Sequence, residues 1–346
     1  MKIDKRNWLF LLCCVVLLTA CSQVSPSTPG NSALAETTEA LETPLSQRFR
    51  SMAAGSYGTC LIIAPDGSLV GWGANENGEL PGVNSSLSFE ERQVFLENMQ
   101  EVYTGYSMDA ALGQNGTLYA WATQQDRGLG HADAQATPYP EVYAVMDEVQ
   151  MADTGMGYAA AIREDGSLWV WGNNDYGQLG NGTTGGGHLQ PEKRMDHAAF
   201  IYCDLFDTYV ITQDHELYTF GCIGGSVPKQ IASDVVDIST SSVGISILTT
   251  DNKVYIGTVS ESDSISWEPY AENAQRLLPG GYVDREGVLW LFQREEKPMQ
   301  VVEDVVDGSF YHENTYLCLT SDGTLREIDL ETGKELWNWP WYHILP

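Results

Sequence analysis

The chain has 346 residues, of which 43% are hydrophobic, so it is long enough to bury the core of one sizeable globular domain. It holds 47 acidic and 18 basic residues, which gives a formal net charge of −29 at pH 7. So acidic a surface repels nucleic acid phosphates, and we therefore expect no nucleic acid partner.

Residues 1–20 have the features of a bacterial lipoprotein signal peptide. Lys2, Lys5 and Arg6 form a positively charged start, and the apolar run at 8–18 is too short to stay as a membrane-spanning helix. The following Leu-Thr-Ala-Cys, ending at Cys21, resembles a lipobox. We expect export across the cytoplasmic membrane and anchoring in the cell envelope by lipid on Cys21. The alternative is an ordinary signal peptide with a chance cysteine.

Residues 21–46 carry the lipidated Cys21 and a segment rich in Ser, Thr, Pro and Glu. A segment of this composition lacks the apolar residues for a core, so it is predicted to be a disordered, flexible tether. The remaining part, 47–346, forms one domain.

Seven times in that domain an apolar run meets a tight turn and a second apolar run begins. The clearest copies lie at 64–73, 113–121 and 163–172, where Asp-Gly or Asn-Gly predicts a β-hairpin with a type I′ turn. The seven turns are centred on Gly67, Gly116, Gly166, His215, Asn252, Gly287 and Gly323. The first three units are longer, with insertions at 75–89, 123–139 and 173–191.

A fixed repeat of this size indicates a repeat architecture. The strands are apolar on both faces, as in Leu168, Trp169, Val170 and Trp171, which suits sheets stacked face to face. Three or four short strands in each of seven units predict an all-β, seven-bladed β-propeller. We expect the segment near 48–53 to close the ring by pairing with strands of the C-terminal unit.

Residues 165–180 read Asp-Gly-Ser-Leu-Trp-Val-Trp-Gly-Asn-Asn-Asp-Tyr-Gly-Gln-Leu-Gly. This stretch resembles the repeat of the regulator of chromosome condensation family, and the unit at 64–80 keeps part of the same pattern. The resemblance covers roughly 50–346, is weak in the second half and implies the propeller fold. The family's best-known role is nucleotide exchange on a nuclear GTPase with chromatin binding, which does not suit an acidic, lipid-anchored protein.

The domain contains four cysteines, Cys60, Cys203, Cys222 and Cys318. Cys60 and Cys318 belong to the first and last units, so a disulfide between them would lock the ring. Small buried thiols are the favoured interpretation, and the sequence leaves the disulfide state open.

No catalytic motif or zinc spacing is present, and we expect no cofactor and no metal. One segment, 329–337, resembles the repeat of pyrroloquinoline-quinone-type propellers, but a single copy is better explained as a hairpin. The sequence leaves open whether the protein is an enzyme and favours a non-enzymatic role.

Four aromatic residues outside the repeat positions are candidate ligand-binding residues: Tyr139, Tyr143, Tyr176 and Trp267. The favoured function is an extracytoplasmic binding or scaffold protein that recognises a protein, peptide or glycan through loops on one propeller face. The alternatives are a hydrolase or lyase with carboxylates near the central funnel, and an envelope assembly factor.

Overall fold

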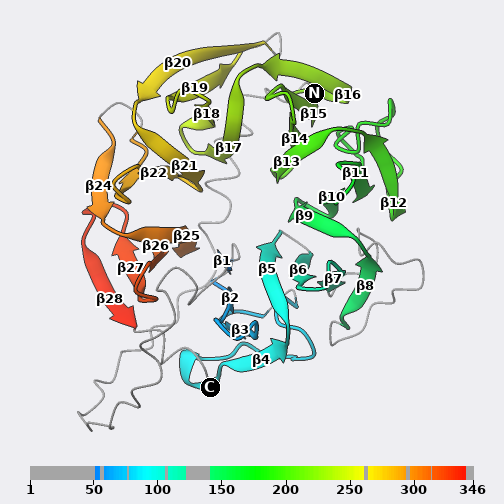
Figure 1. Ribbon diagram of the computed structural model, residues 1–346. Coiled ribbons are helices and arrows are strands. Elements are labelled where there is room, and N and C mark those ends of the chain that lie inside the picture. The colour runs from blue at the N-terminus through cyan, green and yellow to red at the C-terminus, as the bar shows by residue number, and fades with distance from the viewer. Residues whose placement is uncertain are drawn as a thin grey trace, which may run out of the picture.

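The computed structural model describes residues 51–54, 58–75, 78–105, 108–121, 141–260, 264–293, 297–312 and 314–339. These residues form seven four-stranded antiparallel sheets arranged as blades around a common axis (Figure 1). The predicted all-β, seven-bladed propeller is confirmed. The signal peptide, Cys21 and the tether lie outside the described residues. The described part includes one turn of 3-10 helix, Phe89–Glu91.

Each blade is built from four consecutive strands, with the first strand innermost. Blade 1 contains β1 (Ser51–Ala54), β2 (Cys60–Ile63), β3 (Leu69–Trp72) and β4 (Gln93–Leu96). Blade 2 contains β5 (Met99–Thr104), β6 (Asp109–Gly113), β7 (Leu118–Trp121) and β8 (Tyr143–Met146). Blade 3 contains β9 (Val149–Thr154), β10 (Tyr158–Arg163), β11 (Leu168–Gly172) and β12 (His188–Met195).

Blades 4 to 7 follow the same order. Blade 4 contains β13 (Ala198–Cys203), β14 (Asp207–Thr212), β15 (Leu217–Gly221) and β16 (Gly225–Ala232). Blade 5 contains β17 (Val235–Ser241), β18 (Gly244–Thr249), β19 (Val254–Val259) and β20 (Ile265–Ala271). Blade 6 contains β21 (Ala274–Leu278), β22 (Gly281–Asp284), β23 (Leu289–Leu291) and β24 (Met299–Val302). Blade 7 contains β25 (Val305–His312), β26 (Thr315–Thr320), β27 (Leu325–Asp329) and β28 (Glu335–Trp339).

All seven predicted turns join the second and third strands of a blade, but their type differs from the prediction. Only the last turn residue has positive φ, for example Gly67 at 89° and His215 at 63°. In blade 1, Gly67 N–H donates to the carbonyl of Ala64 and Ala64 N–H donates to the carbonyl of Ser68, both at 2.9 Å. This is a three-residue loop that ends in a left-handed residue, not a type I′ turn. Asp66 is favoured there because its carboxylate accepts the N–H of Ser68 at 2.9 Å.

The linkers between blades lie at the same edge of the ring as these turns. Met99 N–H donates to the carbonyl of Gly67, and Gln114 N–H donates to the carbonyl of Asn98, both at 2.8 Å. The same two bonds recur at the five following junctions. We call this edge the turn face. The opposite edge, which carries the loops between first and second and between third and fourth strands, is the loop face.

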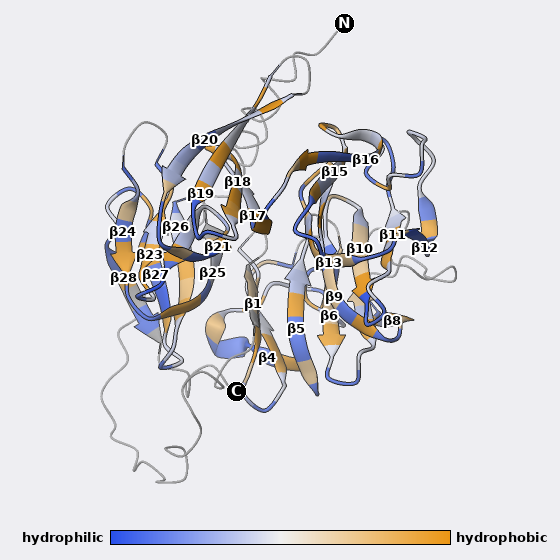
Figure 2. Ribbon diagram, turned by 45° about the horizontal axis from the view of Figure 1, so that its top comes forward, coloured by the Kyte–Doolittle hydropathy of each residue, from blue (hydrophilic) through white to orange (hydrophobic). Residues whose placement is uncertain are grey.

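Each pair of neighbouring blades shares its own hydrophobic cluster, and there are seven such clusters among the described residues. Leu168 and Val170 pack toward blade 4, whereas Trp171 packs toward blade 2. Figure 2 shows the resulting pattern, with hydrophobic residues on inner strands such as β6 and β10 and hydrophilic residues on the edge strand β12. Blades therefore stabilise one another on both sides.

The predicted closure of the ring by strand pairing with the C-terminal unit is wrong. β1 pairs with β2 of its own blade, Ser51 opposite Ile63 and Ala54 opposite Cys60. Blade 7 is complete without it, because β25 to β28 form a full sheet. Blades 7 and 1 meet by packing of Leu317 and Leu319 against Met52, Cys60 and Ile62.

Candidate binding surface

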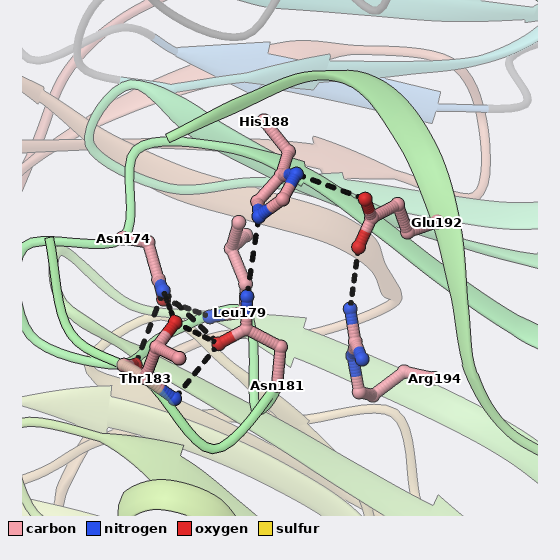
Figure 3. Close-up of polar contacts among 7 residues, drawn as sticks. All are labelled: Asn174, Leu179, Asn181, Thr183, His188, Glu192 and Arg194. Carbon is pink, nitrogen blue, oxygen red and sulfur yellow. Dashed lines mark hydrogen bonds and ion pairs between the residues drawn. The ribbon is translucent and has the colours of Figure 1, made fainter. Parts of the chain in front are cut away.

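The longest loop on the loop face that is described without a gap joins β11 and β12 in blade 3 and contains the Gly-Gln-Leu-Gly segment. Asn174 is completely buried at its base. Its side-chain oxygen accepts the N–H of Leu179 at 3.0 Å, and its amide donates to the carbonyl of Thr183 at 3.1 Å. Gly185 N–H donates to the Asn174 carbonyl at 2.6 Å. One buried side chain near the start of the loop therefore holds its middle part at Leu179 and Thr183 (Figure 3).

The same loop docks onto blade 4. Leu179 joins the hydrophobic cluster around Phe220, and the carbonyl of Gln178 accepts the Thr208 hydroxyl at 2.8 Å. A Cβ on Gly180 would lie 2.8 Å from the Phe220 ring and one on Gly177 would lie 2.8 Å from the Ser226 Cα. Both positions also have positive φ, so glycine is required. The repeat motif thus serves to attach one blade to the next.

Blade 1 repeats this arrangement with its partial copy of the motif. The side-chain oxygen of Asn75 accepts the N–H of Leu80 at 2.8 Å, and its amide donates to the carbonyl of Val83 at 2.8 Å. The carbonyl of Glu79 accepts the indole N–H of Trp121 in blade 2 at 2.9 Å. The correspondence of Asn75 with Asn174 shows that the motif has a structural role in both copies.

A second set of polar contacts ties the blade 3 loop to its edge strand (Figure 3). His188 Nδ1 lies 2.8 Å from Glu192 Oε1, and Arg194 lies 3.2 Å from Glu192 Oε2. Asn181 Nδ2 lies 3.3 Å from His188 Nε2. With the amide donating to Nε2, the ring proton lies on Nδ1 and is donated to Glu192. These contacts tie the loop to β12.

Four apolar side chains stand on or beside this fixed loop, and we call them the loop-face patch: Tyr176, Leu189, Phe206 and Val227. The half-buried rings of Tyr176 and Phe206 lie 4.5 Å apart, which joins blades 3 and 4 at the surface. Leu189 is 49% exposed and Val227 is 55% exposed. Single exposed apolar side chains are common on protein surfaces, whereas several that lie together mark contact sites.

The structure places the predicted binding residues on separate blades. Tyr176 belongs to the loop-face patch. Tyr143, on β8 of blade 2, is half-buried against the core and donates to Glu141 at 2.9 Å. Trp267, on β20 of blade 5, lies at the outer wall, where its indole N–H donates to the carbonyl of Ile231 at 3.3 Å. Tyr139 and Cys21 lie outside the described residues.

Leu189, Phe206 and Val227 were not among the predicted residues. Phe206 lies in a corner between β13 and β14, and the other two lie on edge strands next to polar residues. Nothing in the local sequence marks Leu189 and Val227 as exposed, because each stands on a strand of mixed polar and apolar residues.

Carboxylates gather around the ring axis on the innermost strands. Asp153, Asp237 and Asp307 each accept the N–H of the following residue at 2.8 Å. The second oxygen of each accepts a backbone N–H from the next blade, from Cys203 at 2.7 Å, Leu277 at 2.7 Å and Met52 at 3.0 Å. Both oxygens of each carboxylate are thus engaged in holding neighbouring blades together.

These carboxylates have altered acidity. Burial raises the pKa of Asp153 to about 7 and that of Asp237 to about 6, although their backbone hydrogen bonds oppose the shift. Burial also raises the pKa of Asp307 and of Asp204. Raised pKa values accompany many catalytic carboxylates, but they arise as readily in structural networks. The backbone hydrogen bonds to both oxygens of Asp153, Asp237 and Asp307 favour a structural role for these carboxylates.

Within the described ranges, no group of three or more His, Cys, Asp or Glu residues could hold a metal ion. Cys60, Cys203, Cys222 and Cys318 are all present as thiols, so the ring is not locked by a disulfide between its first and last blades. No helix among the described residues is long and apolar enough to span a membrane.

Residues 165–195, in blade 3, match the sequence profile of the regulator of chromosome condensation (RCC1) repeat. A comparison with curated protein sequences gives no significant match. Among solved structures, human WBSCR16 is similar with a TM-score of 0.54 and 15% identity, over 91% of this chain and 88% of that protein. Yeast RCC1 (Prp20), in its complex with Kap60, is similar with a TM-score of 0.52 and 18% identity. This match covers 80% of this chain and 69% of that protein.

A second structure of Prp20p from Saccharomyces cerevisiae gives a TM-score of 0.51 and 15% identity, over 62% of this chain. That match spans 60% of the Prp20p chain. Identities this low establish the fold and leave the activity open. The chain is a seven-bladed β-propeller, and one stretch of its blade 3, residues 165–195, matches the RCC1 repeat.

Proposed function

We propose that this propeller is a binding platform and that it contacts a protein through the loop-face patch. The observation that carries the proposal is the exposure of Leu189, two residues beyond the blade 3 loop, and of Val227, next to Ser226, whose carbonyl accepts the N–H of Gly182 in that loop at 2.7 Å. A rigid apolar surface loses little conformational entropy when it binds, which favours affinity. The axial carboxylates offer no comparable case for catalysis, since each oxygen of Asp153, Asp237 and Asp307 already accepts a backbone N–H.

The comparisons support protein binding in general terms. Prp20p was characterised with its binding to Gsp1p and histones, and yeast RCC1 (Prp20) was solved bound to Kap60. The net charge of −29 favours a partner with a neutral or basic contact surface and disfavours nucleic acid.

The proposal includes a lipid anchor at Cys21 and a location outside the cytoplasm. Its support is the pattern of residues 1–21. The chain enters the ring at the turn face, because Ser51 pairs with Ile63, next to the turn at 64–67. A flexible tether would therefore join the ring at its turn face. The loop-face patch lies at the opposite edge, where the tether leaves it open to a partner.

The binding proposal is tested by replacing both exposed aliphatic residues with acids, Leu189→Asp together with Val227→Asp. We expect the double variant to lose the proteins that the wild-type chain captures from envelope extract, as measured by quantitative mass spectrometry. Leu336→Asp is the matched control, since Leu336 is 53% exposed on β28 of blade 7. Equal thermal unfolding of all three proteins shows that folding is unaffected. Unchanged capture by the double variant would remove the loop-face patch from the proposal.

The anchor is tested separately by Cys21→Ser in the full chain. We expect this variant to leave the membrane fraction and to incorporate no radiolabelled palmitate. Retention of label by the variant would contradict lipidation at Cys21, without bearing on the loop-face patch.

A further inference from the structure

A shallow groove lies between blades 4 and 5, beside the turn face, with a volume of about 420 Å³. Ser233 and Asp234 of the interblade linker form one wall, and Thr249, Tyr255 and Trp267 of blade 5 form the other. The groove thus combines two aromatic rings with a carboxylate. It is remote in sequence and blade position from Leu189 and Tyr176, the blade 3 members of the loop-face patch.

The corresponding place in blade 3 can be identified from the backbone register. Arg163 pairs with Val149 and its N–H donates to the Ser167 carbonyl. Thr249 pairs with Val235 and its N–H donates to the Lys253 carbonyl, which is the same position in blade 5. The remaining correspondences follow the same register: Asp147 with Ser233, Glu148 with Asp234, and Trp169 with Tyr255.

In blade 3 this place is filled by the protein's own arginine. Arg163 Nε donates to the carbonyl of Asp147 at 3.1 Å, and its Nη2 lies 3.0 Å from Glu148 Oε2. The Arg163 guanidinium carbon lies 5.7 Å from the centre of the Trp169 ring. A carbonyl, a carboxylate and an aromatic face therefore surround one guanidinium group.

Blade 5 presents the same three partners without the arginine. The carbonyl of Ser233, the carboxylate of Asp234 and the ring of Tyr255 stand at the equivalent positions, whereas Thr249 is too short to reach them. Lys253 does not replace the missing cation at Asp234, because its ammonium group pairs with Asp251 at 2.7 Å. The interactions that Arg163 makes within blade 3 are therefore available in blade 5 to a guanidinium group from another molecule.

Trp267 adds a second aromatic wall that blade 3 lacks. Its ring lies across Gly257, where a Cβ would meet the Trp267 Cζ3 atom at 2.5 Å. A glycine at this position of β19 lets the indole lie across the strand, beside Tyr255 in the lining of the groove. Two aromatic side chains and a carboxylate suit the planar, weakly hydrated guanidinium better than a lysine ammonium group.

We propose that the groove between blades 4 and 5 binds an arginine side chain presented by a protein or peptide. The site goes beyond the proposed function and does not depend on it, since it uses the turn face and different residues. Asp234 pairs with the guanidinium, the Ser233 carbonyl accepts a further N–H, and the rings of Tyr255 and Trp267 cover its faces.

The test is calorimetric titration of the full chain with a capped Gly-Gly-Arg-Gly-Gly peptide and its citrulline and lysine counterparts. We expect one site with a Kd on the order of 1–10 mM for the arginine peptide, as a single side chain can supply. Citrulline keeps the shape without the charge and is expected to give no measurable heat. The lysine peptide is expected to bind at least about fivefold more weakly. Equal binding of citrulline or of lysine would overturn the guanidinium assignment.

Three variants identify the site. Thr249→Arg fills the groove as Arg163 does in blade 3 and is expected to abolish binding. Asp234→Asn keeps the side-chain volume and is expected to weaken binding roughly tenfold. Arg163→Thr opens the equivalent place in blade 3 and is expected to raise the number of sites from one to two.

Thermal unfolding accompanies each titration. If Thr249→Arg fails to fold, Asp234→Asn and Arg163→Thr still decide the matter, because one loses and the other gains binding. Unchanged affinity in Asp234→Asn, or a single site in Arg163→Thr, would overturn the proposed correspondence between the two blades.

Discussion

Asp307 of blade 7 accepts the backbone N–H of Met52 in blade 1 at 3.0 Å, which joins the two ends of the ring. Many propellers could close by sharing a strand between first and last blades, but here each blade keeps its own four strands. The same contact joins blade 3 to blade 4 through Asp153 and blade 5 to blade 6 through Asp237. The seam is therefore held by an interaction that also operates elsewhere in the ring.

Removal of this carboxylate is expected to weaken the seam. Asp307→Ala leaves the N–H groups of Met52 and Gly308 without their acceptor, and we expect the free energy of unfolding to fall by about 1–3 kcal/mol. Asp237→Ala is expected to cost a similar amount, since its bonds have the same geometry. Urea denaturation measures both, with Asp214→Ala on an exposed turn as the control. No change in Asp307→Ala would show that apolar packing alone closes the ring.

The axial carboxylates are expected to make the protein more stable at mildly acidic pH than at pH 8. Burial raises the folded-state pKa of Asp153 to about 7 and of Asp237 to about 6, above that of an unfolded aspartate. Between the pKa of an unfolded aspartate and these raised values, the folded state binds more protons than the unfolded state. The free energy of unfolding therefore falls as pH rises. Urea midpoints at pH 5, 6, 7 and 8 are expected to decline, most steeply between about pH 5 and 6, where both carboxyl groups are still largely protonated in the folded state, and to level off above about pH 7.

Asp153→Asn provides the control for this pH dependence, because the amide cannot titrate. Its midpoints are expected to decline less over the same range. A wild-type midpoint that rises steadily from pH 5 to 8 would contradict the assignment.

The two buried asparagines are expected to hold their loops in the same way. Asn174→Ala removes the acceptor for Leu179 N–H and the donor to Thr183, and we expect a loss of about 1–3 kcal/mol with faster hydrogen exchange at Leu179. Asn75→Ala is expected to do the same at Leu80. Thr184→Ala, at an exposed position of the same loop, is the control. Protected exchange at Leu179 in Asn174→Ala would show that docking on blade 4 is sufficient.

The cysteines are expected to differ in their reactivity toward a thiol reagent. Cys60, Cys203 and Cys318 are buried, and burial raises the pKa of each thiol, so little reactive thiolate forms. Cys222 is half-buried and is expected to react first in the native protein. Mass spectrometry after timed iodoacetamide treatment assigns the order. Early modification of Cys60 would indicate that the seam between blades 7 and 1 opens.

Much of the fold could be predicted from the sequence because its strongest signals are local. Asp-Gly or Asn-Gly marks four of the seven turns, and the Asp or Asn side chain accepts a hydrogen bond within the turn, as Asp66 does from Ser68. Two turns without glycine are also predictable, because His and Asn tolerate the left-handed backbone. His215 and Asn252 both have positive φ in the structure. The turn type was missed, since Asp-Gly fits both a type I′ turn and a three-residue loop.

The ring closure could not be predicted from such signals. Asp307 and Met52 are 255 residues apart, and their contact joins a side chain to a backbone group. The two candidate surfaces also depend on how residues far apart in the sequence are placed relative to one another. Tyr176 was singled out as an aromatic residue outside the repeat, but Leu189 and Val227 become a surface only when the blade 3 loop docks on blade 4. The significance of Thr249 appears only when blades 3 and 5 are compared in register.

Because every blade is a single uninterrupted stretch of the chain, the order of units in the gene is the order around the ring. Circular permutation at any of the interblade linkers would therefore produce new ends without dividing a sheet. For the same reason, duplication or deletion of one coding unit would add or remove a whole blade, so rings of this kind can change size in complete steps.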